Sequence, residues 1–252
     1  VTRTLIHKEL MEGFRSYRLL IWIIVCSFFG ILSPLSAYYM PQMLSLLGST
    51  QNIFLSLSEV TYRDAIEQYI KNFTQIGAII LIFLTMGSIA GEKQDGLLEF
   101  LLVRPVSVRA ILVSKSIALV CMVIIGIGIS SVLTSAYSMY LFEVFPLMSF
   151  FTSNVLLVLY LIVIGFITLS LSAVMEKPLS AGISSFGVWL VFSVFGALGD
   201  AGWYSFTRLG QQIMPFVEGF PVSLKPAFSA ILIIMVSFVC AFSVLKRWES
   251  TS

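Results

Sequence analysis

The chain has 252 residues, of which 58% are hydrophobic and 11% are charged, whereas a soluble domain carries about 25% charged residues. A soluble fold of this size could not cover so much apolar surface, so the composition excludes an ordinary soluble protein. The formal net charge of +2 is too small to indicate a nucleic-acid-binding protein, and no basic stretch is interleaved with aromatic residues.

Residues 1–18 predict an amphipathic helix that lies on the cytoplasmic surface of a membrane. Helical spacing places four apolar side chains on one face and charged residues, such as Lys8 and Glu9, on the other. Such a helix lies in the membrane interface; the alternative is a charged flank that only orients the first span. No small-residue cleavage site follows, so we expect no cleaved signal peptide. The apolar face consists of Ile6, Leu10, Phe14 and Tyr17.

Six apolar runs follow, and each is long enough to cross about 30 Å of hydrocarbon as a helix. Lipid offers the backbone no hydrogen-bonding partners, and the alternation of a barrel is missing, so helices are expected. The predicted fold is an all-α integral membrane protein with a transmembrane domain at residues 19–245 and a cytoplasmic tail at 246–252. The spans are expected at about residues 19–39, 73–90, 110–135, 150–174, 179–198 and 227–245.

The distribution of Lys and Arg predicts the orientation of the six spans. The basic residues before span one, between spans two and three, between spans four and five, and after span six all fall on one side. Because an excess of positive charge marks the cytoplasmic side, both termini are expected in the cytoplasm. We expect a multi-pass protein of a bacterial cell membrane. The opposite side holds only Arg63, Lys71, Arg208 and Lys225.

Two outer connections are long, at about residues 40–72 and 199–226. In the second, aromatic residues are broken by glycine and proline, which predicts short interfacial or re-entrant helices at the outer leaflet. An aromatic belt that anchors the last two spans is the alternative. The aromatic residues are Trp203, Tyr204, Phe206, Phe216 and Phe220, and the breaks are Gly210, Pro215 and Pro221.

The cytoplasmic connection at residues 91–109 carries the most informative pattern. Four leucines at i, i+1, i+4 and i+5 predict a short helix with an apolar stripe. Arg104 precedes Pro105 and ends this helix, because proline disfavours helical geometry in the residue before it. Ser107 can then cap the helix that leads into span three. The stripe consists of Leu97, Leu98, Leu101 and Leu102.

Two features missing from the sequence limit the activities. All Asp, Glu, Lys and Arg residues lie outside or at the edge of the six runs, whereas proton-coupled transporters and intramembrane proteases usually place a charge inside. The sequence has no glycine-rich phosphate loop, so the chain cannot hold ATP by itself. We expect no catalytic, cofactor-binding or metal site. Met40 and Met43 could suggest copper, but no His or Cys supports the pair.

The cytoplasmic connection resembles that of the type-2 ABC transporter permeases, the ABC-2 family. The amphipathic start, the six spans and the chain length match as well, so the resemblance covers essentially the whole sequence. The pattern is Glu92-Lys93-x-x-Gly96-x-x-Glu99-x-x-Leu102-x-x-Pro105-Val106-Ser107, followed by Lys115 at the head of a span.

This resemblance implies the permease subunit of an ATP-driven exporter, with ATP and Mg bound by a separate ATPase subunit. The connection would be a coupling helix seated in a cleft of that ATPase, flanked by the N-terminal helix. Acidic side chains would meet basic groups of the ATPase, leucines would fill its apolar cleft, and Arg104 would fix the turn. The implied coupling residues are Glu92, Lys93, Gly96, Leu97, Glu99, Leu101, Arg104 and Pro105.

The resemblance also implies a second permease copy or a paralogue, because ABC exporters enclose one pathway between two six-helix halves. Small residues such as Gly87 and Gly91 predict close helix contacts, one of which would form the seam. Two alternatives stay open. One is a secondary transporter or channel, which the uncharged spans disfavour, and the other is a non-transporting scaffold that relays ATPase work to an outer partner.

Overall fold

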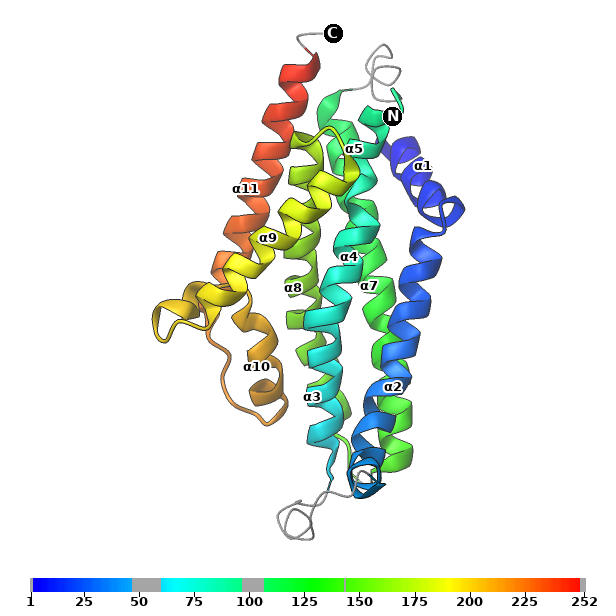
Figure 1. Ribbon diagram of the computed structural model, residues 1–252, viewed down its shortest axis with the longest axis vertical. Coiled ribbons are helices and arrows are strands. Elements are labelled where there is room, and N and C mark those ends of the chain that lie inside the picture. Colours follow the sequence, from blue (N-terminus) through cyan, green and yellow to red (C-terminus); the bar gives the residue numbers. More distant parts are fainter. Residues whose placement is uncertain (1, 47–59, 97–106, 143, 250–252) are drawn as a thin grey trace.

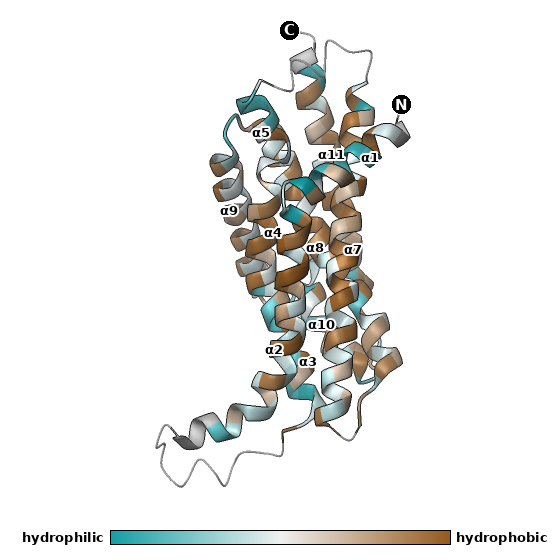
Figure 2. Cartoon of the chain, turned by 90° about the vertical axis from the view of Figure 1, so that its right-hand side faces the viewer, coloured by the Kyte–Doolittle hydropathy of each residue, from teal (hydrophilic) through white to brown (hydrophobic). Residues whose placement is uncertain are grey.

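The computed structural model describes residues 2–46, 60–96, 107–142 and 144–249, and these form an elongated bundle of helices (Figure 1). Six of the helices in this part of the chain are long and apolar enough to cross a membrane, which confirms the expected all-α membrane fold. In Figure 2 the middle of the bundle is mainly hydrophobic, and hydrophilic segments gather toward its ends. The six spans are Arg18–Gln42, Tyr62–Gln94, Val108–Leu141, Leu147–Val174, Pro178–Gly196 and Leu224–Arg247.

The N-terminal helix α1 (Thr2–Arg15) folds back onto the bundle instead of continuing into the first span, α2 (Arg18–Leu46). Tyr17 makes this turn with a φ of 59°, a left-handed backbone that non-glycine residues rarely adopt. As a result α1 packs against α2 and α7 (Val108–Leu141). α1 and the end of α11 (Leu224–Glu249) lie at the same end of the bundle (Figure 1). We call this the cytoplasmic end, following the orientation predicted from the basic residues.

The second span consists of four helical pieces, α3 (Tyr62–Asn72), η2 (Phe73–Gly77), α4 (Ala78–Thr85) and α5 (Gly87–Gln94). It begins before the expected residue 73 because Thr61 and Asp64 form a capping box. α3 is amphipathic: its apolar face packs into the bundle, and its other face is polar. The apolar face that is buried comprises Ala65, Ile66, Tyr69 and Ile70.

The helix η2 is a single π-helical turn inside this span. Its wider turn leaves the Thr74 carbonyl available, and the Tyr160 hydroxyl donates to that carbonyl at 2.9 Å. A second interruption follows at Met86, between α4 and α5. Turns of the π type and interrupted hydrogen-bond ladders are places where helices bend, so the second span contains two such places.

α8 (Leu147–Val174) forms the centre of the bundle and contacts α4, α5, α7, α9 (Pro178–Gly196), α10 (Arg208–Val217) and α11. Two short helices, η3 (Ala201–Tyr204) and α10, occupy the outer connection between α9 and α11. α10 buries its apolar face against α8 and α3. Large side chains with almost no exposure fill the core: Trp22, Tyr69, Phe73, Phe150 and Phe206.

Candidate functional site

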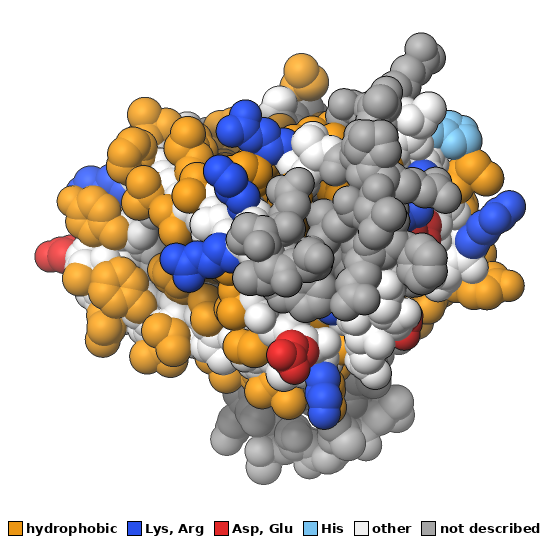
Figure 3. All heavy atoms as spheres, turned by 90° about the horizontal axis from the view of Figure 1, so that it is seen from above, with side chains coloured by type: hydrophobic (Ala, Val, Ile, Leu, Met, Phe, Trp, Pro, Cys, Tyr) orange, Lys and Arg blue, Asp and Glu red, His pale blue; other side chains and the backbone are white. Residues whose placement is uncertain are grey.

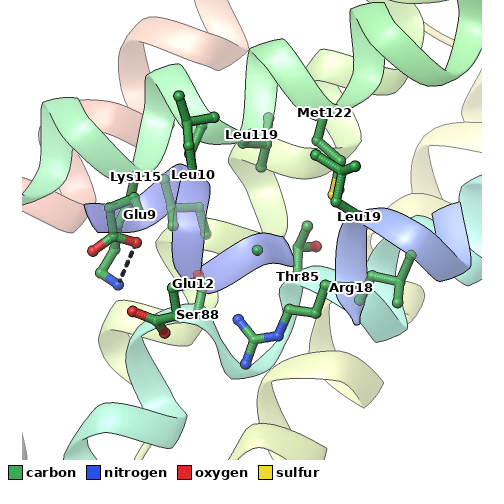
Figure 4. Close-up of a pocket in the computed structure, with 14 residues that line it drawn as sticks. Glu9, Leu10, Glu12, Arg18, Leu19, Thr85, Ser88, Lys115, Leu119 and Met122 are labelled. Atoms are coloured by element: carbon green, nitrogen blue, oxygen red, sulfur yellow. Dashed lines mark hydrogen bonds and ion pairs between the residues drawn. The ribbon is translucent and has the colours of Figure 1, made fainter. Parts of the chain in front are cut away.

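A buried lysine connects three helices at the cytoplasmic end of the bundle. The side chain of Lys115 on α7 is only 3% exposed. Its Nζ donates to Oε1 of Glu92 on α5 at 2.7 Å and to Oε2 of Glu9 on α1 at 3.2 Å. Figure 4 shows the bond between Glu9 and Lys115 where α1 crosses α7. Segments far apart in the sequence are therefore joined by a single ammonium group.

Lys8 extends this network toward the surface. Its Nζ lies 3.6 Å from Glu9, 3.5 Å from Glu12 and 3.9 Å from Glu92. Burial lowers the pKa of Lys8, but the carboxylates of Glu9, Glu92 and Glu12 outweigh burial and raise this pKa above its ordinary value. Lys8 is therefore charged throughout the physiological range of pH. Figure 3 looks down on this end, where Lys and Arg side chains lie among apolar ones.

The energetics make this network sensitive to the loss of any partner. Glu92 is 7% exposed, and its Oε2 atom has no hydrogen-bond partner among the described residues. Removing one partner from a buried ion pair costs about 3–5 kcal/mol, because the other charge is left uncompensated. The network thus stabilises one arrangement of α1, α5 and α7, and it penalises arrangements that separate them.

A second set of bonds ties α5 to the cytoplasmic end of α8. The hydroxyl of Ser172 accepts from the backbone N–H groups of Ile89 and Ala90, at 3.1 and 2.9 Å, and donates to the Met86 carbonyl at 2.7 Å. The Lys93 ammonium donates to the Ala173 carbonyl. Ser172 therefore binds the backbone of the first turn of α5, just after the interruption at Met86.

The predicted coupling residues lie in different environments, and several of them fall outside the described residues. Glu92 and Lys93 face the bundle, with the partners given above, although we expected Glu92 to meet basic groups of an ATPase. Gly96 follows α5 with a φ of 69°, a backbone conformation that suits glycine at a helix end. The remaining coupling residues lie outside the described part of the chain: Leu97, Glu99, Leu101, Arg104 and Pro105.

The predicted apolar face of the N-terminal helix is placed as follows. Ile6 and Leu10 on α1 are half-buried, Phe14 is 60% exposed, and Tyr17 lies in the turn after the helix. Glu9, which the helical spacing puts on the charged face, instead contacts Lys115. From the sequence, Lys115 counted among the basic residues that predict the orientation and as part of the family pattern, without a predicted partner. The available signal was a lysine at the start of an apolar run, which needs a charged partner.

A cavity of about 700 Å³ lies toward the other end of the bundle, between α3, η2, α8, α9 and α10. Its aromatic wall is fixed by a chain of hydrogen bonds, because Trp189 Nε1 donates to the Tyr160 hydroxyl at 2.8 Å and Tyr160 donates to Thr74. Polar side chains share the lining with these rings. They include Gln75, Ser193, Thr207 and Gln211. No pattern in the sequence predicted this cavity.

Comparison with known proteins agrees with this architecture. The family model described as "ABC-2 family transporter protein" matches residues 3–221. A relative in Bacillus subtilis (strain 168), named "Uncharacterized transmembrane protein YxlG", is 31% identical over 117 residues. The match covers 46% of this chain and 45% of that relative, so the chain spans less than half of the relative's length. Because the family match extends over most of the sequence, the chain belongs to the ABC-2 family of transporter proteins.

Proposed function

We propose that this chain is the permease subunit of an ATP-driven exporter and that it pairs with a second copy or a paralogue. A separate ATPase subunit binds ATP and Mg and docks on the cytoplasmic connection between the second and third spans. The observation that carries the proposal is the Lys115–Glu92–Glu9 network, which joins both helices flanking that connection to α1.

The network gives the ATPase a stiff attachment. α5 leads into the connection and α7 leads out of it, and Lys115 holds the two together through Glu92. A force on the connection would therefore move α5, α7 and α1 as one body. The two interruptions of the second span, at η2 and at Met86, are places where this movement can become a bend.

The outer cavity supplies a place for the transported molecule. Its volume of about 700 Å³ lies within the range of roughly 300–1,000 Å³ found for small-molecule sites. Two aromatic rings, several amide and hydroxyl groups and the Glu67–Lys71 ion pair line it together, which suits an amphipathic molecule. The cavity also borders η2, so a bend of the second span there would change its shape.

Co-purification of the ATPase tests the proposed docking. The tagged chain is expressed together with its chromosomal neighbours, in wild type and with Leu97→Asp, which places a charge in the predicted coupling stripe. Leu224→Asp is the matched control, because this leucine is exposed at the opposite, outer end of the bundle. We expect the ATPase to accompany the wild type and the control, and to be lost with Leu97→Asp.

Two results would contradict the proposal in different ways. If no ATPase co-purifies with the wild type, the exporter proposal is wrong, and the hypothesis of a secondary transporter replaces it. If the ATPase stays bound to Leu97→Asp, the coupling stripe is not the docking surface.

A further inference from the structure

A pocket under α1 has the features of a lipid headgroup site. Residues of α1, α2, α4, α5, α7 and α8 line it (Figure 4). It lies where the first span begins and the second ends, the level at which headgroups meet acyl chains. Its volume of about 80 Å³ exceeds the ~10–15 Å³ that one water needs. The pocket therefore has room for more than one water-sized chemical group of a ligand.

Arg18 provides the strongest sign of an anionic ligand. Its side chain lines the pocket, and within the described residues its guanidinium has no acceptor or ion-pair partner. A Cβ on Gly87 would lie 3.6 Å from Nη2 of Arg18, so the guanidinium rests beside the interruption between α4 and α5. A guanidinium presents a planar fork of donors that matches phosphate oxygens.

Two further donors face the same pocket. The Ser88 hydroxyl is buried without a hydrogen-bond partner in the described part of the chain. Arg18 and Leu19, which both line the pocket, are the first residues of α2, whose opening N–H groups lack helical acceptors. Helix starts favour phosphate groups for this reason.

Glu9 and Lys115 also line the pocket, paired with each other, and Glu12 adds a further negative charge. Its carboxylate lines the pocket from α1, and its ion pair is with the half-exposed Lys8 at 3.5 Å. A purely anionic headgroup would be repelled by this carboxylate, whereas a headgroup with both a phosphate and an ammonium satisfies Arg18 and Glu12 together. Leu84, Leu119 and Met122 in the same lining offer apolar contacts.

We propose that this pocket binds an ethanolamine phospholipid of the cytoplasmic leaflet. The phosphodiester accepts from Arg18 and Ser88, the primary ammonium donates to Glu12, and the glycerol end of one acyl chain enters the apolar part. A lipid bound there contacts α1, the start of α2 and the interruption of the second span at once. It therefore holds α1 against the bundle.

Native mass spectrometry of the purified full chain tests this site without an ATPase. Phosphatidylethanolamine, phosphatidylcholine and phosphatidylglycerol with identical chains are added one at a time, and 1:1 adducts are measured. We expect the ethanolamine lipid to bind about tenfold more tightly than the other two, and Arg18→Gln to weaken it about tenfold through loss of charged hydrogen bonds. Glu12→Gln should abolish the preference over phosphatidylglycerol.

The controls separate a specific site from general lipid adhesion. Arg15→Gln removes an exposed charge from α1, three residues before Arg18, at a position that does not line this pocket, so this variant should bind the lipid as the wild type does. Arg18→Lys keeps the charge but loses the planar fork, and it should fall between wild type and Arg18→Gln. Equal binding of the three lipids, unchanged binding by Arg18→Gln, or equally tight binding of soluble glycerophosphoethanolamine would each overturn the proposal.

Discussion

Replacing Lys115 with methionine should release α1 from the bundle. The change keeps most of the side-chain volume but leaves Glu9 and Glu92 without the ammonium that lies 3.2 and 2.7 Å from them. Loss of one partner from a buried network costs about 3–5 kcal/mol. The amide protons of α1 exchange by local opening, so this loss corresponds to exchange faster by about 100- to 4,000-fold, at 1.4 kcal/mol per factor of ten.

Hydrogen exchange of peptides covering α1, measured by mass spectrometry in lipid nanodiscs, gives this number directly. Adding Glu9→Gln and Glu92→Gln to Lys115→Met should restore much of the protection, because no buried charge remains unpaired. Lys71→Met is the control, since Lys71 forms an exposed pair with Glu67 at 3.3 Å and should change stability by less than about 1 kcal/mol. Unchanged protection of α1 in Lys115→Met would refute the reasoning.

Three further predictions concern the packing of the spans. Ser172→Ala removes an acceptor that two backbone N–H groups share. The amide protons of residues 89 and 90 should then exchange faster, by the factor that corresponds to about 1–3 kcal/mol of opening free energy. Unchanged exchange rates would count against this role of Ser172. Gly126→Ala puts a Cβ 2.1 Å from Nε1 of the buried Trp22, so the free energy of unfolding should fall by about 1–3 kcal/mol. At Gly128 an added Cβ has open space, so Gly128→Ala should not lower the free energy of unfolding. In Gly210→Leu the new Cβ lies 2.7 Å from Cγ2 of Thr74 and should displace α10, so the amide protons of α10 should exchange faster; unaltered exchange would contradict the close contact.

The sequence predicted the six spans because apolar runs decide which segments lipid accepts. It placed the start of the second span too late, since Glu67, Gln68 and Lys71 lower the hydropathy of α3. Thr61 and Asp64 carried the local signal for that start, a capping box that a search for apolar runs does not detect. Span boundaries thus depend on caps as well as on hydropathy.

The candidate site was less predictable than the fold. Glu9 contacts Lys115, which lies 106 positions away in the sequence. This contact depends on the turn at Tyr17, and a tyrosine gives no reason to predict a left-handed backbone there. The outer cavity depends likewise on how α10 packs against α8. Both are consequences of tertiary packing, which periodicity and spacing do not encode.

The central claim is that α1, α5 and α7 move as one body when the ATPase closes. Spin labels at His7 on α1 and Lys177 between α8 and α9, both exposed, report this movement as a distance, once Cys26, Cys121 and Cys240 are replaced by alanine. We expect that trapping the complex with ATP and vanadate shifts this distance in the wild type, and that Lys115→Met abolishes the shift while ATP is still hydrolysed. The same shift in Lys115→Met as in the wild type would contradict the claim.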